Sequence, residues 1–367
     1  MVVDTTANML DYLAWRGDLT FAADGFNEVD NLIFSELAYV NMDGLAPESF
    51  GERISVRELC ARYTAAGRDQ SYLVNDPSHA LKAAAGTKRF GEAELCGYVN
   101  EVDVERQMQF SAVTFLPGDG SVFVAFRGTD NTIVGWREDF NMNFLPETPG
   151  QAEAAAYLRR ALDEFRLPTR VGGHSKGGNF AVYAAAFCKS GNGEIVAVYS
   201  NDGPGLNRET ARTPEYLAVV PKITKIVPDQ SLVGLLLAGC ETPKAVKSDA
   251  KGIMQHNPYT WQISGNSFVP AEATGETIAD ETVRRWSESL DGEQWKNFSQ
   301  ALFDALEASG ATTLYELNSA KATYYTAVAR ALYKTDRAVY HGFLDAAKKL
   351  LRSGVDTLET RGRRKKN

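Results

Sequence analysis

The sequence predicts an α/β fold in which a mostly parallel central sheet is covered by helices. Predicted strands and helices alternate between about residues 108 and 227, a pattern typical of parallel strands joined by crossover helices. Residues 169–188 contain a short β-like run, a glycine-rich turn and an alanine-rich helix. From about residue 271 the strand pattern stops, and the helical patterns that follow predict a C-terminal helical appendage.

The first 90 residues predict helices only. Apolar residues recur on one helical stripe between residues 26 and 40. A second helix is predicted to start after an N-cap at Ser55 and to run to Ala66. A third is predicted over residues 77–85, with Gly86 as its terminator. This part carries no evident chemistry, and His79 is expected on the surface.

Period-two patterns then predict the sheet. Residues 108–115 and 121–126 predict a hairpin around the turn at 117–120, and its second strand is apolar at nearly every position, as expected for a strand buried on both faces. The other predicted strands are 169–171, 194–200 and 222–227. The other predicted helices are 151–165, 179–188, 280–306, 320–332 and 336–351.

These elements predict a domain over residues 1–270, with a helical part at 1–90 and a sheet core at 91–270. A helical appendage at 271–356 and a basic tail at 357–367 follow. The chain of 367 residues is 44% hydrophobic, so it can bury a large core. Its net charge of -8 excludes nucleic acid as a partner of the whole chain. We expect the basic tail to be a solvated end, with weak contact to an anionic membrane surface as the alternative.

The cysteines and the apolar runs indicate neither a metal site nor a membrane span. The cysteines are far apart and form no C-x-x-C pair; they are Cys60, Cys96, Cys188 and Cys240. The longest apolar run, residues 232–240, has half of the roughly 18 residues that a membrane span needs. No signal-peptide pattern is present at the N-terminus. We therefore expect a cytoplasmic protein that needs no metal or cofactor.

The turn at residues 172–178, Gly-Gly-His-Ser-Lys-Gly-Gly, has the G-x-S-x-G pattern of a nucleophile elbow. Ser175 would occupy a strained turn, and Gly173 and Gly177 would let strand and helix close around it. The N-terminus of the following helix favours negative charge at Ser175. The alternative is a glycine-rich turn without catalytic role.

A serine hydroxyl needs a base, usually a histidine, and this chain has four histidines. His79 precedes the sheet, His174 is inside the elbow with its side chain expected to point away from Ser175, and His341 is in the appendage. His256 remains, in a loop after the last strand region, and we predict it to be the base.

The acid is expected between Ser175 and His256 in the chain. Asp249 is predicted to lie in a solvated loop, whereas Asp202 and Asp229 both follow strands. Asp229 follows the later strand and is the preferred candidate, with an N-cap role as its alternative. Asp202 is the reserve candidate, since the Asn-Asp-Gly-Pro-Gly sequence is also typical of a turn.

Acyl transfer also needs hydrogen-bond donors for an oxyanion. We assign one to the backbone N–H of Lys176, directly after the nucleophile. The second is assigned to the N–H of Thr129, which follows the predicted strand at 121–126 in Arg-Gly-Thr. The apolar run that contains Leu232, Leu235 and Leu236 has two equal interpretations. It either lines an acyl pocket or forms a helix of the core.

Several of these segments resemble class 3 lipases. Residues 125–129, Ala-Phe-Arg-Gly-Thr, resemble their oxyanion segment, residues 173–178 their GHSLGG elbow, and Val-Pro-Asp at 227–229 their acid segment. Lys176 stands where that elbow usually has leucine, and a cation there would favour an acidic acyl group or alter access. More closely, the chain resembles the bacterial Mbeg-like proteins, a family of unknown function that shares this α/β-hydrolase plan.

The resemblance implies an α/β-hydrolase fold and the triad Ser175, Asp229 and His256. It is most specific over residues 107–260. The function expected is hydrolysis of a small-molecule or lipid-like acyl ester through an acyl-serine intermediate. Thioester or amide hydrolysis, acyl transfer to an alcohol, and a non-catalytic binding or scaffold role stay open as alternatives.

Overall fold

The computed structural model describes most of the chain. The described residues are 7–68, 77–189, 192–271, 278–313, 316, 330–331, 335 and 337–364. They form two compact units. The first contains residues 1–101, 109–128 and 149–274, and the second contains residues 102–108, 129–148 and 275–367. None of the helices in the described part of the chain is long and apolar enough to cross a membrane.

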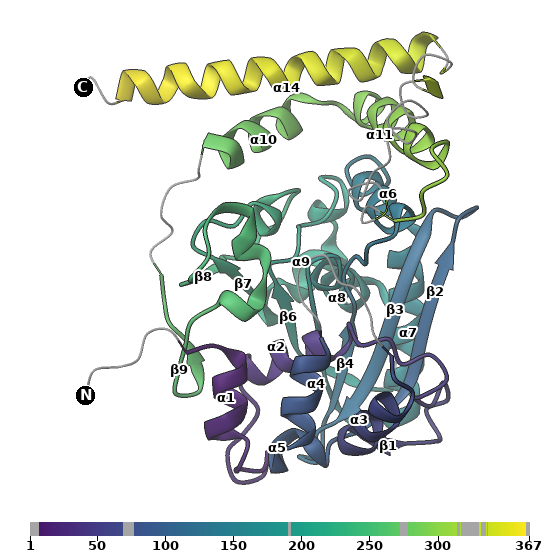
Figure 1. The fold of residues 1–367 in the computed structure, drawn as a ribbon, viewed down its shortest axis with the longest axis vertical. Coiled ribbons are helices and arrows are strands. Elements are labelled where there is room, and N and C mark those ends of the chain that lie inside the picture. Colours follow the sequence, from purple (N-terminus) through teal and green to yellow (C-terminus); the bar gives the residue numbers. More distant parts are fainter. Residues whose placement is uncertain are drawn as a thin grey trace. The chain divides into compact units, whose positions relative to one another are not determined.

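The first unit is built on an eight-stranded sheet whose strands follow the order of the sequence (Figure 1). The strands are β1 Ile54–Ser55, β2 Glu94–Asp103, β3 Met108–Leu116, β4 Val122–Phe126, β5 Pro168–His174, β6 Glu194–Asn201, β7 Ile223–Pro228 and β8 Lys244–Val246. The β1–β2 and β3–β4 pairs are antiparallel, whereas β4 to β8 are parallel. The predicted α/β class with a mostly parallel sheet is therefore confirmed. Strands β1, β2 and β8 were not predicted.

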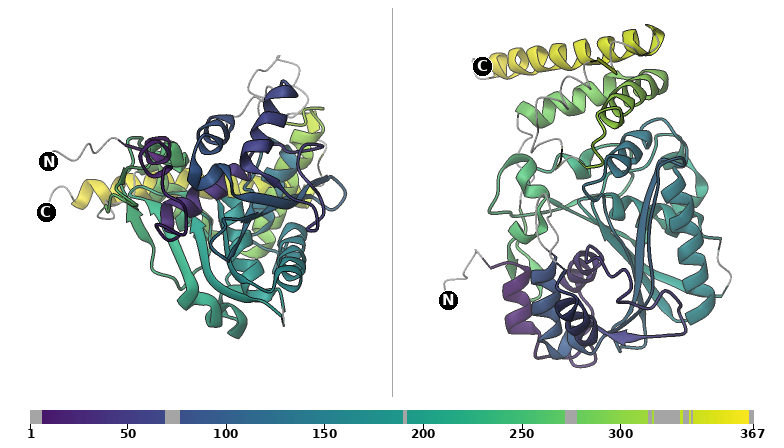
Figure 2. Two further views of the ribbon diagram at one scale, coloured as in Figure 1. Left: turned by 90° about the horizontal axis from the view of Figure 1, so that it is seen from below. Right: turned by 45° about the vertical axis from the view of Figure 1, so that its right-hand side comes forward.

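Helices cover both faces of this sheet (Figures 1 and 2). Alternate side chains of a strand point to opposite faces, and on β4 Phe123 stacks near Phe34 of α2 (Glu28–Leu37), with ring centroids 5.5 Å apart. Phe126, three residues later, meets Tyr157 of α7 (Pro149–Phe165) edge-on at 6.0 Å. Helix α8 (Lys176–Phe187) packs against α7, β5 and β6. The sheet is thus covered by α2 on one face and by α7 and α8 on the other.

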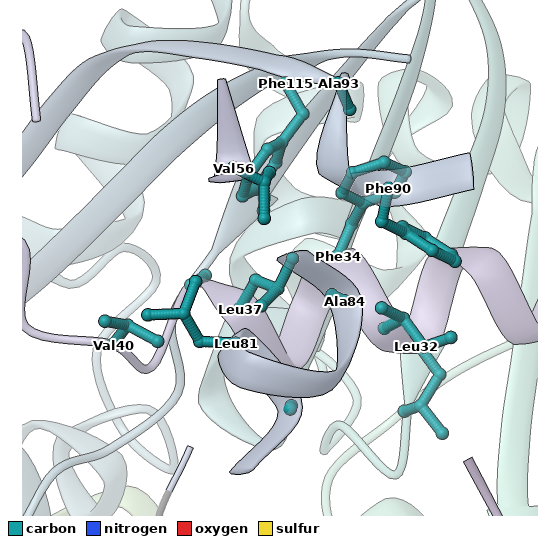
Figure 3. Packing of buried hydrophobic residues seen from close by; sticks show 14 of the residues in the cluster. Leu32, Phe34, Leu37, Val40, Val56, Leu81, Ala84, Phe90, Ala93 and Phe115 are labelled. Atoms are coloured by element: carbon teal, nitrogen blue, oxygen red, sulfur yellow. The ribbon is translucent and has the colours of Figure 1, made fainter. Parts of the chain in front are cut away.

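The N-terminal helices pack around α2 to form the main hydrophobic core (Figure 3). They are α1 Met9–Arg16, α3 Val56–Ala65, α4 Ser78–Ala85 and α5 Lys88–Gly91. The expected N-cap is present, since the Ser55 side chain accepts a hydrogen bond from Glu58 N–H at 3.0 Å. His79 is exposed, as expected. In Figure 3, Phe34 and Leu37 of α2 lie close to Phe90, Leu81 and Ala84.

Short elements complete the first unit after β6. They are η1 Thr210–Arg212, α9 Pro214–Val219, η2 Val220–Lys222, η3 Val233–Leu235, η4 Gly252–His256, η5 Pro258–Thr260, β9 Ile263–Ser264 and β10 Ser267–Phe268, where η marks a 3-10 helix. The apolar run from Leu232 contains only the three-residue η3, so its interpretation as a core helix is wrong. Leu237 has a positive φ of 65°, and Ala238 forms an isolated β-bridge with Leu206, which together prevent a longer helix.

The second unit is helical. Among the residues that the structure describes, its helices are α6 Ile133–Asn141, α10 Ile278–Ser289, α11 Gly292–Glu307 and α14 Arg337–Arg364. Helix α14 packs on α10 and α11, and the Trp286 indole N–H donates to Ala346 O at 2.8 Å. The predicted helix at 280–306 is two helices, because Asp291 begins α11 with a capping box. The predicted helix at 320–332 lies almost entirely outside the described residues.

The division of the chain differs from the expected one because residues 129–148 group with the C-terminal helices. Helix α6 packs on α11, and Ile133 shares a buried cluster with Phe303 and Ala311. Arg137 of α6 pairs with Asp304 at 2.9 Å and Glu307 at 2.9 Å. The C-terminal end also differs, because α14 continues past the predicted helix at 336–351 into the predicted basic tail and ends at Arg364.

Candidate active site

The predicted elbow lies between β5 and α8, with Ser175 as the single residue between them. Ser175 has φ 58° and ψ -132°, a backbone conformation that residues other than glycine rarely adopt. A Cβ at Gly177 would lie 2.1 Å from Phe126 O, and a Cβ at Gly173 would lie 2.3 Å from the backbone of Gly177. Both positions therefore require glycine, because β4, β5 and α8 approach one another at backbone distance.

Backbone hydrogen bonds hold Ser175 in this conformation. Its N–H donates to Asn201 O at 3.0 Å, which extends the β5–β6 ladder by one residue. Its carbonyl accepts from Gly178 N–H at 2.9 Å, at the first turn of α8. A Cβ at Gly128 would lie 3.0 Å from Ser175 Cβ, so the chain leaving β4 passes directly beside the serine. The hydroxyl is thus fixed at the carboxyl edge of the sheet.

His256 is the histidine that meets Ser175. Its Nε2 lies 2.9 Å from Ser175 Oγ, within hydrogen-bond distance. His256 ends η4, and this loop is anchored because the buried Trp261 indole N–H donates to Gln255 O at 2.8 Å. The His256 side chain is 23% exposed, so it is reachable from solvent while bonded to the serine.

The carboxylate at His256 is Asp202, so the preference for Asp229 is wrong for this geometry. Asp202 Oδ2 lies 2.7 Å from His256 Nδ1, and the Asp202 side chain is 1% exposed. Asp202 directly follows β6, the neighbour of β5, whereas Asp229 follows β7, one strand further from Ser175. Asp229 Oδ1 instead accepts a hydrogen bond from Gln255 Nε2 at 2.7 Å. The expected chain order of serine, aspartate and histidine is kept.

The Asn-Asp-Gly-Pro-Gly loop holds Asp202, the reserve candidate for the acid, in a sequence that is also typical of a turn. Asp202 has a φ of 48°, a left-handed conformation that aspartate tolerates better than most residues. Its N–H donates to Ile226 O at 2.7 Å, so the turn is tied to the next strand. The loop is a turn and also holds the carboxylate that contacts His256.

Hydrogen bonds keep Asp202 ionised in spite of its burial. Burial raises the pKa of Asp202, but hydrogen bonding and charge from His256, together with the Ser231 hydroxyl, hold that pKa below its ordinary value. The Ser231 hydroxyl donates to Asp202 Oδ1, which also accepts from Gly234 N–H at 3.1 Å. One carboxylate oxygen therefore faces His256 and the other is held by two donors.

The Lys176 side chain does not lie where it could act on a substrate as expected. Its side chain is buried, and its ammonium group donates to Gln109 O at 3.1 Å. The cation therefore points into the protein rather than toward an acyl group. Its backbone N–H lies at the first residue of α8, where the predicted oxyanion donor is expected. That role stays a prediction.

The remaining predicted site residues are Thr129 and the three leucines. Thr129 belongs to the second unit, where its hydroxyl donates to Asp139 Oδ2 at 2.6 Å, and its oxyanion role stays a prediction. Leu235 is 43% exposed, and Leu232 and Leu236 are partly exposed, so an acyl-pocket role also stays a prediction. No group of three or more metal-ligating side chains occurs among the residues that the structure describes.

Comparison with solved structures finds lipases. The M37 lipase is 16% identical, with 55% of this chain and 68% of that chain covered and a TM-score of 0.36. The Rhizomucor miehei lipase in its propeptide complex is 14% identical, covering 55% and 72%, with a TM-score of 0.34. Lipase II from Rhizopus niveus is 15% identical, covering 52% and 76%, with a TM-score of 0.32. No curated protein matches the chain.

Comparison with family models confirms the predicted family. The Mbeg1-like model matches residues 84–304, which is more than half of the chain and includes β3 to β8 and the elbow. The sheet order, the covering helices and the strand–turn–helix elbow are those of an α/β-hydrolase fold. The chain therefore belongs to the Mbeg1-like family.

Proposed function

We propose that this protein is a serine hydrolase that cleaves acyl esters through an acyl-serine intermediate. The observation that carries the proposal is the continuous hydrogen-bond chain from Ser175 Oγ through His256 to Asp202, at 2.9 and 2.7 Å. A nucleophile in reach of a base, with that base oriented by a buried carboxylate, is the arrangement that activates a serine. The strained elbow supports the same role, because strain of this kind gathers at functional sites.

In the proposed reaction, Ser175 Oγ attacks the carbonyl carbon of the ester while His256 Nε2 takes the hydroxyl proton. The oxyanion accepts a hydrogen bond from the backbone N–H of Lys176. The C–O bond breaks, and the alcohol leaves with the proton from His256. Water then attacks the acyl-serine, again giving a proton to His256, and the acid is released as the proton returns to Ser175.

Labelling with a fluorophosphonate tests the activated serine. The probe phosphonylates an activated serine and releases fluoride, and intact-mass measurement gives the rate. We expect the wild type to label and Ser175→Ala not to label. His256→Ala should label about 100- to 10,000-fold more slowly, because the general base is lost. His79→Ala, which removes an exposed histidine, is the matched control and should label like the wild type.

A substrate panel then tests the reaction class. Activated esters, thioesters and amides of equal acyl chain, each with and without an alcohol acceptor, separate ester hydrolysis from its alternatives. Faster turnover of the ester in water supports the proposal. Product that forms only with the alcohol would replace it with acyl transfer, and absence of labelling of folded wild type would favour a binding role.

A further inference from the structure

A second histidine, His174, contacts the backbone of the histidine in the triad. Its ring is buried, with Nε2 2.8 Å from His256 O and the two imidazole centroids 4.7 Å apart. A carbonyl oxygen only accepts hydrogen bonds, so Nε2 of His174 must carry the proton. Burial, together with the nearby His256 ring, lowers the pKa of His174 to about 3, so the His174 ring is neutral. Its Nδ1 is therefore an acceptor.

Two groups from the α2 region face that acceptor. Glu36 Oε1 of α2 lies 3.3 Å from His174 Nδ1, and the Tyr39 hydroxyl lies 3.2 Å from it. The Tyr39 hydroxyl also lies 3.2 Å from His174 O, and its single proton can serve only one of the two acceptors. Glu36 thus supplies the second donor if it carries a proton.

Glu36 has the environment of a neutral carboxyl group. Its side chain is 6% exposed, and Oε1 accepts no hydrogen bond from the described residues. A buried, ionised carboxylate oxygen without a hydrogen-bond donor is costly in free energy. A protonated carboxyl group can instead donate to His174 Nδ1, which gives both Glu36 Oε1 and His174 Nδ1 a partner. Burial alone raises the pKa of Glu36, to about 8. A neutral Glu36 carboxyl carries a proton that it can donate to His174 Nδ1, 3.3 Å away.

We propose that Glu36 and His174 are positioning residues that hold the backbone of His256, and with it the imidazole, in line with Ser175 Oγ. The Glu36 carboxyl donates to His174 Nδ1, and His174 Nε2–H donates to His256 O. This inference rests on the proposed function, and it extends the site to a helix that precedes the sheet in the chain.

The arrangement predicts a response to alkaline pH. When Glu36 loses its proton, the carboxylate attracts a proton to His174 Nδ1, and Nε2 then becomes an acceptor facing His256 O. Two acceptors 2.8 Å apart repel each other, so the His256 backbone is released. The titratable groups around this pair are Tyr39 at the Nδ1 edge and His256 and Asp202 at the Nε2 edge.

The test compares wild type, Glu36→Gln and Glu36→Met by fluorophosphonate labelling rate from pH 6 to 10. The Gln amide donates at every pH, whereas Met fills the space without a donor. We expect Glu36→Gln to match the wild type at pH 7 and Glu36→Met to be about 10- to 100-fold slower, the effect of a small misplacement of the base. Above pH 8 the wild-type rate should fall toward that of Glu36→Met, while Glu36→Gln shows no such fall.

Thr114→Val is the matched control. It removes a different buried hydrogen bond, the 2.8 Å contact between the hydroxyls of Thr114 on β3 and Tyr157. It should lower the melting temperature without changing the pH profile. Nitrogen NMR of His174 in wild type gives a readout independent of activity, and the Nε2–H tautomer is expected at pH 7. An Nδ1–H tautomer, or equal profiles for all three Glu36 forms, would overturn the inference. Wild type that labels at no pH would overturn the proposed function instead.

Discussion

Replacing Asp202 by asparagine tests whether the carboxylate at His256 is the acid, rather than Asp229, which the resemblance favoured. Asp202 Oδ1 is held by the Ser231 hydroxyl and by Gly234 N–H, and both are donors. An asparagine must therefore keep its oxygen there and turn its NH2 group to His256 Nδ1. That group donates, so Nδ1 must accept and the imidazole proton moves to Nε2, facing Ser175 Oγ. The histidine can then no longer take the serine proton.

The wrong tautomer sets the size of the effect. Loss of the correct tautomer in a serine triad lowers kcat by about 10,000-fold, which corresponds to about 5 kcal/mol of transition-state stabilisation. We expect a loss of this order in kcat for Asp202→Asn, measured with an activated ester. Circular dichroism and melting temperature establish that the variant is folded.

Asp229→Asn is the matched control, because it makes the same change beside the same loop. Asp229 Oδ1 accepts from Gln255 Nε2, and an asparagine oxygen can still accept that bond. Its kcat should stay within a factor of about three of the wild type, the effect of weakening one partly exposed hydrogen bond. A large loss in Asp229→Asn with little loss in Asp202→Asn would refute the assignment and restore Asp229 as the acid.

Three further predictions follow from the same geometry. Gly177→Ala should give little folded protein, because the new Cβ would lie 2.1 Å from Phe126 O. Gly51→Ala is its control and should hardly change the melting temperature, because the nearest atom to its new Cβ would be Ser49 Oγ at 3.7 Å. Ser231→Ala should lower kcat for the ester about 10-fold, because Asp202 loses a hydrogen bond worth about 1.5 kcal/mol; an unchanged kcat would contradict this. Burial raises the folded-state pKa of Glu36 from 4.5 to about 8, so its protonated form stabilises the fold below pH 4.5, and that stability is lost as the pH rises to 8. Relative to Glu36→Gln, which does not titrate, the wild type should lose up to about 5 kcal/mol over this range in urea unfolding, and parallel curves would exclude the raised pKa.

The sequence predicted the elbow and the elements around it because their causes are local. Glycine at 173 and 177, an apolar strand before Ser175 and an alanine-rich helix after it each act within a few residues. The same holds for Ser55, whose side chain caps α3 from three residues away. Elimination among four histidines led to His256, because His79 precedes the predicted sheet, His174 lies inside the elbow and His341 lies in the helical appendage.

The contact of Asp202 with His256 and the grouping of residues 129–148 with the C-terminal helices were not predicted, because their causes are not local. Asp202 and Asp229 both follow strands, and only the sheet order tells which strand lies beside β5. Similarly, α6 has an ordinary amphipathic sequence, and its pairing of Arg137 with Asp304 joins residues far apart in the chain. Glu36 was missed for the same reason, since nothing near it in the sequence marks a buried carboxyl.

Backbone hydrogen bonds of the sheet offset the backbone strain at Ser175 and Asp202. Ser175 and Asp202 both have positive φ, a cost of about 1 to 3 kcal/mol each for residues other than glycine. Each N–H donates to the neighbouring strand, Ser175 to Asn201 O and Asp202 to Ile226 O, so the ladder continues through both residues. Breaking either conformation would leave a buried backbone donor unpaired, at a cost of about the same size. The strands thus hold Ser175 and Asp202 on either side of His256 before any substrate arrives, which is the preorganisation that the proposed chemistry needs.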